Sequence, residues 1–142
     1  MASPQFASPE EFRSVMDQIF EMMSTDEEVG PKLRDADVPQ RFEFDDVDLV
    51  VNIRAAEEAE DGNLHWEWSD DVPWEPRVRM TMSSETANKY FQGKENIALA
   101  IARRRIKTGG DVKAALEIMP IAKPVFARYT ELVRREYPHL EV

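Results

Sequence analysis

The sequence predicts a single α+β domain in which a five-stranded, mostly antiparallel sheet is covered on one face by helices. Three observations predict it. Apolar residues recur at three- and four-residue steps near the N-terminus, they alternate with polar residues between positions 41 and 83, and helix and strand patterns then succeed one another as far as position 137. Since no linker, repeat or low-complexity segment interrupts the 142 residues, we expect one domain over residues 1–142.

The first expected element is a helix over residues 8–23. Ser8 can cap the helix, Pro9 suits its first position, and Glu11 completes a capping box. One face carries a stripe of apolar residues that we expect to be buried: Phe12, Val15, Met16, Ile19, Phe20 and Met23. The Gly30-Pro31 pair restricts any helix that follows to a short one.

Four strands are expected next, because the apolar period changes to two between residues 41 and 83. The alternating apolar residues are Phe42, Phe44, Leu49, Val51, Ile53, Leu64, Trp66, Trp68, Val78, Met80 and Met82. Short polar turns separate the strands, which favours an antiparallel meander with one covered face. The acidic loop from Ser69 to Pro76 holds Trp74 between two prolines, where the ring either closes over a cavity or anchors its own turn.

The C-terminal half, residues 84–137, is expected to supply the covering helices and the fifth strand. Gly93 is placed to end a helix in the left-handed conformation. We expect the fifth strand at residues 104–108. A last helix is expected over about residues 121–136, with Pro124 confined to its first turn.

The order of these C-terminal segments resembles the sterol carrier protein type 2-like (sterol-binding domain) family. The residues that carry the resemblance are Val78 to Ser84, Phe91-Gln92-Gly93-Lys94, Arg105 to Leu116, and Met119 to Phe126. The resemblance covers about a third of the chain by residues and the remainder by the order of elements. It implies a small lipid-binding domain with an apolar cavity between sheet and helices.

The composition excludes several classes of function. The formal net charge is −10, with 28 acidic and 18 basic residues, which disfavours nucleic-acid partners and anionic membranes. There is no cysteine, so disulfides and thiolate chemistry are excluded. No apolar run is long enough for a transmembrane segment, and the first residues lack the pattern of a secretory signal, so we expect a cytoplasmic protein.

Reactive side chains are too few to predict an enzyme. Of the two histidines, His65 alternates out of phase with Trp66 and Trp68, and His139 lies close to the C-terminus. The sequence carries no nucleophile elbow, phosphate-binding loop or calcium loop. We therefore expect no catalytic residue, no metal and no cofactor, and we interpret the acidic clusters as solvated turns.

The remaining candidate site is apolar. Its expected lining is Trp66, Trp68, Met80, Met82, Tyr90, Phe91, Ile97, Ile101, Leu116, Met119 and Phe126. Large rings and flexible thioethers can line an adaptable cavity. Periodicity alone favours a filled core for these residues, whereas the family resemblance favours a cavity wall. Arg103, Arg104 and Lys107 are the candidate contacts for an acidic headgroup.

Two functions follow from this site. The first is non-catalytic binding or carriage of an apolar lipid such as a fatty acid, a fatty acyl thioester or a sterol. The alternative is a protein-interaction or dimerisation module with a filled core, in which the partner is a second copy of the chain or another protein. An exposed amphipathic helix over residues 125–137 would support that alternative.

Overall fold

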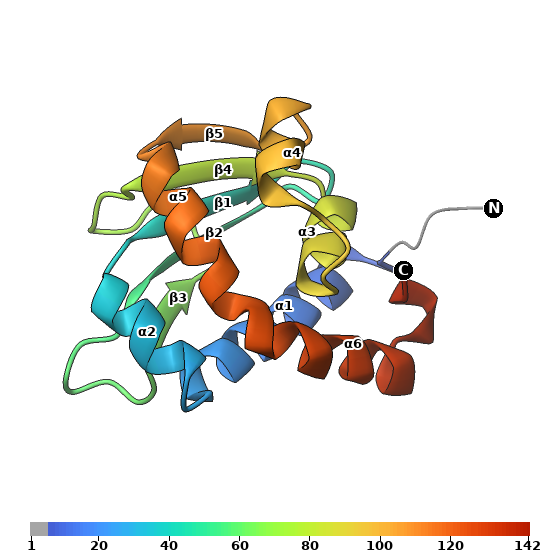
Figure 1. Ribbon diagram of the computed structural model, residues 1–142, viewed down its shortest axis with the longest axis horizontal. Coiled ribbons are helices and arrows are strands. Elements are labelled where there is room, and N and C mark those ends of the chain that lie inside the picture. The colour runs from blue at the N-terminus through green and yellow to red at the C-terminus, as the bar shows by residue number, and fades with distance from the viewer. Residues whose placement is uncertain (1–5) are drawn as a thin grey trace.

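The computed structural model describes residues 6–142, and in it five strands form one sheet (Figure 1). The strands are β1 (Gln40–Phe44), β2 (Leu49–Ala55), β3 (Leu64–Glu67), β4 (Val78–Met82) and β5 (Lys107–Gly110), in the spatial order β3-β2-β1-β4-β5. The pair β1 and β4 is parallel, and the other three pairs are antiparallel. The predicted fold class, a mostly antiparallel five-stranded sheet in an α+β domain, is confirmed.

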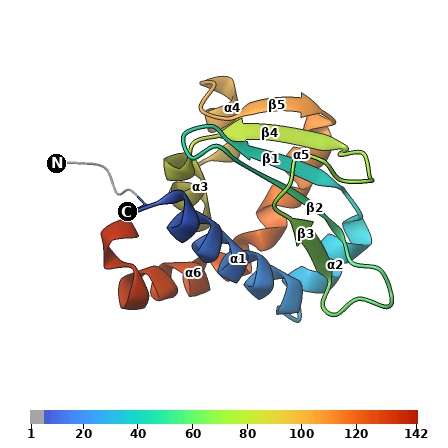
Figure 2. The same ribbon diagram turned by 180° about the vertical axis from the view of Figure 1, so that it is seen from behind.

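The helices gather on one face of the sheet, where α5 crosses in front of the strands in Figure 1 and lies behind them in Figure 2. They are α1 (Pro9–Thr25), α2 (Val29–Ala36), α3 (Ser84–Phe91), α4 (Ile97–Ala102), α5 (Val112–Ile118) and α6 (Lys123–Glu136), with 3-10 turns η1 (Met119–Ala122) and η2 (Pro138–Leu140). As the capping box predicts, the backbone N–H of Glu11 donates to Ser8 Oγ at 3.1 Å.

The predicted meander of four strands is wrong at its last strand. β4 pairs with β1, with Val78 opposite Gln40 and Met82 opposite Phe44, and does not pair with β3. Because β3 is an edge strand, the chain must pass β2 and β1 before it enters β4. Alternation of apolar residues indicates which face of a strand is buried, and it carries no information on which strand lies beside it.

The fifth strand also begins later than predicted. The expected range was 104–108, and β5 spans Lys107–Gly110. Arg104 has φ 60°, and the N–H groups of Arg105 and Ile106 both donate to the carbonyl of Ala100. These residues form the turn that ends α4, so the strand can start only after them.

Register places the apolar residues of neighbouring strands on the helix-covered face. Phe42 lies between Val51 and Met80, and Ile53 lies opposite Trp66. The apolar stripe of α1 packs against this face and is buried as predicted. A continuous apolar core therefore lies between the sheet and the helices.

A buried polar network attaches the C-terminal segment to this core. Asn88 Nδ2 and Gln92 Nε2 both donate to the carbonyl of Leu140 at 2.8 Å, and the Tyr129 hydroxyl donates to Asn88 Oδ1 at 2.6 Å. Burial raises the pKa of the Tyr129 phenol, so the phenol stays protonated and remains a donor. The network holds η2 against α3.

Gly93 ends α3 in the left-handed conformation that the sequence predicts. Its φ is +74°, and the N–H of Lys94 donates to the carbonyl of Lys89 at 2.8 Å. A Cβ at this position would meet only Phe126 Cδ2, at 3.7 Å, which is ordinary contact. The backbone conformation, and not a lack of space, therefore favours glycine.

Gly93→Val is expected to lower the free energy of unfolding by about 1 kcal/mol or more, since a β-branched side chain is strained at positive φ. Gly93→Asn is the matched control and should cost less, because asparagine tolerates this conformation. Urea unfolding measures both variants. Equal stability of Gly93→Val and the wild type would contradict the assigned end of α3.

Candidate functional site

The interior between sheet and helices contains two small apolar voids, of about 40 and 20 Å³. Both are lined by Phe20, Phe42, Tyr90, Phe91 and Met119. The larger continues toward α2, the end of α5 and η1, and the smaller continues toward Phe44, Met82 and Ala87. We call this pair the interior voids.

A larger apolar groove of about 730 Å³ opens on the surface where α4, α5, η1 and α6 meet. Its larger apolar lining residues are Tyr90, Ile97, Leu116, Met119, Pro120 and Phe126. Tyr90 and Met119 also line the interior voids, so these two residues form the wall between groove and interior. We refer to this feature as the groove.

The wall is closed by one hydrogen bond. The Tyr90 hydroxyl donates to the carbonyl of Met119 at 2.5 Å, and Tyr90 is 6% exposed. Burial raises the pKa of this phenol far above its ordinary value, so the hydroxyl is protonated at neutral pH and acts as a donor. Phe91 and Phe126 pack their rings edge-on against Tyr90, at centroid distances of 4.8 and 5.0 Å.

The structure brings most of the predicted lining residues to these two features. Tyr90, Phe91, Met82 and Met119 line the interior voids. In the groove lie Ile97, Leu116 and Phe126, together with Tyr90 and Met119. Met80 is fully buried within the sheet, and Ile101 is half-buried on α4; neither lines a void or the groove. The assignment of a ligand to these residues remains a prediction.

The side chains of Trp66 and Trp68 contact α1. Both indole N–H groups donate to Asp17 Oδ1, at 3.0 Å from Trp66 and 2.6 Å from Trp68. Phe20 packs against both rings. The partner is Asp17, on the polar side of the α1 stripe, and no sequence pattern pairs it with residues about fifty positions away.

Sequence reasoning assigned several residues of the void lining to the core without placing them at a site. They are Phe20, Met23, Phe42, Phe44, Ile53 and Leu64. Their alternation and helical spacing identified them as buried, and only the packing of α1 and α2 on the sheet brings them to the voids. The same reasoning missed Lys94 and Lys123, which lie at the groove.

Arg103, Arg104 and Lys107 are exposed at the end of α4 and the start of β5, and they line neither the groove nor the interior voids. Arg105 binds Glu95 at 2.7 Å. The cations at the groove are Lys94 and Lys123, both exposed. A headgroup role for Arg103, Arg104 or Lys107 remains a prediction.

The two histidines lie away from the groove. His65 Nδ1 contacts Glu60 Oε2 at 2.7 Å on the other face of the sheet, and His139 contacts Glu11 at 2.9 Å. Hydrogen bonds from the Glu57 N–H and from Arg54 lower the pKa of Glu60 to about 2.

Among residues 6–142 no group of three or more candidate ligands could hold a metal ion. Nor does any helix in that part of the chain have the length and apolar character needed to cross a bilayer.

Comparison with solved structures identifies the fold. The domain 2 of a sterol carrier protein from Helicoverpa armigera aligns with a TM-score of 0.56 and 16% identity, covering 89% of this chain and 96% of that one. Sterol carrier protein 2 from Yarrowia lipolytica, in its apo form, aligns with a TM-score of 0.54 and 15% identity, covering 87% and 98%. This chain has the sterol carrier protein 2 fold. The resemblance seen in the C-terminal half of the sequence is confirmed at the level of the fold.

Two further structures show the same fold in other settings. The ubiquinone synthesis protein UbiJ-SCP2 aligns with a TM-score of 0.59 and 7% identity, covering 85% of this chain and 95% of that one. The sec-alkylsulfatase Pisa1 from Pseudomonas sp. aligns with a TM-score of 0.61 and 18% identity over 75% of this chain, which spans only 16% of the sulfatase. No protein-family model and no curated protein matches the sequence. The assignment of the sterol carrier protein 2 fold therefore rests on the structural alignments.

Asp17→Ala is expected to lower the free energy of unfolding by about 2 kcal/mol, because two partly buried indole N–H groups lose a charged acceptor. Asp17→Asn retains an acceptor oxygen and should lose less. Chemical unfolding followed by tryptophan emission measures both variants. If Asp17→Ala is as stable as the wild type, the two indoles do not depend on Asp17.

Proposed function

We propose that this protein binds an apolar lipid, such as a fatty acid, a fatty acyl thioester or a sterol-like molecule, between its sheet and helices. The observation that carries the proposal is the wall of Tyr90 and Met119, which separates a surface groove from apolar voids in the core. A lipid tail that displaces this wall passes from the groove into the interior. The sterol carrier protein 2 fold of the neighbours supports this proposal.

The closed interior must widen to admit a tail. Voids of about 40 and 20 Å³ are well below the roughly 150 Å³ of an engineered cavity that binds benzene. Burial of eight methylenes would contribute roughly 6 kcal/mol. Loss of the Tyr90–Met119 hydrogen bond costs about 1 kcal/mol. Since Met82 and Met119 can change rotamer easily, widening of the voids is consistent with favourable binding.

The groove can also hold an acidic headgroup. Lys94 and Lys123 line it and are exposed, and the one carboxylate among the described residues of the lining, that of Glu95, is bound to Arg105 at 2.7 Å. A fatty acid would then lie with its tail between Tyr90 and Met119 and its carboxylate at the rim. This arrangement favours fatty acids over sterols, because a sterol has no carboxylate to place at the rim.

A second candidate function is protein interaction or dimerisation through the groove. Two observations favour it: the interior voids are small, and Leu116 is 43% exposed at the groove. Native mass spectrometry of freshly purified protein separates the two functions. An added mass of a few hundred daltons supports carriage, whereas a doubled mass with no added ligand supports dimerisation.

Leu116→Glu is expected to weaken binding of a fluorescent fatty acid about tenfold, because a charged side chain replaces apolar contact surface in the groove. Leu99→Glu is the matched control, since Leu99 is 42% exposed on α4 outside the groove lining and its replacement should leave affinity unchanged. Titration of the probe measures both variants. An equal effect of the two substitutions would show that the groove is not part of the binding site.

The proposal includes carriage without catalysis. Screens with acyl esters and acyl thioesters are expected to give background turnover, and a chelator should leave the melting temperature unchanged. His65 is the histidine held on a strand, so His65→Ala is the informative variant. Turnover by the wild type that disappears in His65→Ala would contradict the carrier function.

A further inference from the structure

The sheet face opposite the helices carries a second candidate site, one that is independent of the proposed lipid function. Register places Arg41 beside Asn52 and Arg79, and Arg54 opposite His65, on this polar face. Figure 2 shows the chain passing from β3 across this face to β4. We call this segment, Ser69 to Pro76, the outer loop.

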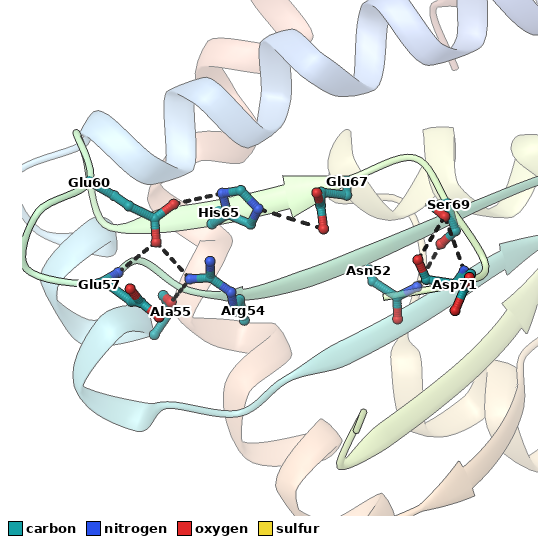
Figure 3. Close-up of polar contacts among 9 residues, drawn as sticks. All are labelled: Asn52, Arg54, Ala55, Glu57, Glu60, His65, Glu67, Ser69 and Asp71. Atoms are coloured by element: carbon teal, nitrogen blue, oxygen red, sulfur yellow. Dashed lines mark hydrogen bonds and ion pairs between the residues drawn. The ribbon is translucent and has the colours of Figure 1, made fainter. Parts of the chain in front are cut away.

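Side chains of the sheet hold the outer loop in place. Asn52 Nδ2 donates to the carbonyl of Ser69 at 2.7 Å, and Arg41 Nη1 donates to the carbonyl of Asp70 at 3.0 Å. Figure 3 shows Asn52 beside the Ser69 turn, and Arg54 and His65 farther along their strands, toward Glu60. Trp74 packs over Arg54, 5.0 Å from guanidinium carbon to ring centroid. The loop is thus anchored at both ends to the outer face.

A hollow of about 420 Å³ lies between the outer loop and the strands. We call it the outer hollow. Its lining is Arg41, Glu43, Asn52, Asp70, Val72, Trp74, Glu75, Pro76 and Arg79. Hollows of this size accommodate small molecules.

Two buried polar atoms of the lining have no hydrogen-bond partner within residues 6–142. They are Asn52 Oδ1 and Trp74 Nε1, both closed to solvent, and Asn52 is 0% exposed. An unsatisfied buried polar group costs free energy, and nearly all such groups in native proteins find partners. One atom is an acceptor and the other a donor. A ligand that supplies the complementary donor and acceptor would remove both penalties.

The charges of the lining favour a neutral ligand. Arg41 is bound to Glu43 at 3.0 Å, and the Glu43 carboxylate also accepts from Thr81. These bonds lower the pKa of Glu43, so its carboxylate stays charged. Arg41 and Glu43 therefore neutralise each other. Arg79 and Glu75 lie 4.0 Å apart at the opening. A free anion would meet Asp70 and Glu75, and a free cation would meet both arginines.

We propose that the outer hollow binds a small neutral ligand through a secondary amide, whose carbonyl accepts from Trp74 Nε1 and whose N–H donates to Asn52 Oδ1. A secondary amide offers a donor and an acceptor on adjacent groups and carries no charge. Because both protein atoms are closed to solvent, the outer loop lifts slightly to admit the ligand. The hydrogen bonds from Asn52 to Ser69 and from Arg41 to Asp70 keep the outer loop attached to the sheet while it moves.

The test follows the indole N–H signals of the three tryptophans by two-dimensional NMR during titration with N-methylacetamide. Trp74→Phe assigns the Trp74 signal and keeps a ring over Arg54. Trp66→Phe is the matched control, since that indole already binds Asp17. We expect a saturating shift of the Trp74 signal alone. N,N-dimethylacetamide lacks the N–H that Asn52 requires and should bind about tenfold more weakly.

Three results would overturn the proposal. Equal movement of all three indole signals would indicate a solvent effect. Equal affinity for the two amides would remove Asn52 Oδ1 from the site. A persistent water contact at Trp74 Nε1 that the amide does not displace would show that water is the partner of both atoms. Lipid titration reports on the opposite face of the sheet, so failure of one proposal leaves the other testable.

Discussion

The parallel pairing of β1 with β4 is the constraint on which the rest of the structure depends. It places Phe42 beside Met80 and Phe44 beside Met82, and so joins the apolar surface of the N-terminal strands to that of the C-terminal half. Parallel neighbours require a crossover connection. Here β2, β3 and the outer loop together make that connection, so the same pairing that completes the core also draws the Trp74 loop across the outer face.

One sheet thereby supports two different chemical environments. Along β4, Met80 points into the core and Arg79 points to the outer face, because successive strand residues alternate. The helix-covered face is apolar and nearly filled, with its unused space close to Tyr90 and Met119. The outer face is polar, and its unused space lies beneath a loop. The interior voids and the outer hollow differ in size and in the polarity of their lining.

The helix-covered side combines rigid and adaptable parts. Asn88, Gln92 and Tyr129 form a satisfied buried network that fixes α3, α6 and the C-terminal segment relative to one another. The wall of the groove depends on the single bond from Tyr90 to Met119 and on a methionine side chain. The lipid binding that we propose requires the wall to open, and the wall has fewer hydrogen bonds than the network.

The sequence by itself determined local features, because each depends on neighbours within a few residues. Ser8 and Glu11 marked the start of α1, Gly93 marked the end of α3, and period-two alternation identified the buried face of β1 to β4. It also indicated five apolar residues of the groove, and three of them, Leu116, Met119 and Phe126, lie in segments that resemble the sterol carrier family. The strand order and the limits of β5 did not follow from such short-range signals.

Only the tertiary structure decided which distant residues meet. Asp17 receives Trp66 and Trp68, Tyr90 binds Met119, and the outer loop covers Asn52. Each contact joins segments brought together by strand order and helix packing, which alternation does not specify. A buried face can be recognised from the residues along one strand, whereas a partner across the fold depends on the free energy of the whole packed arrangement.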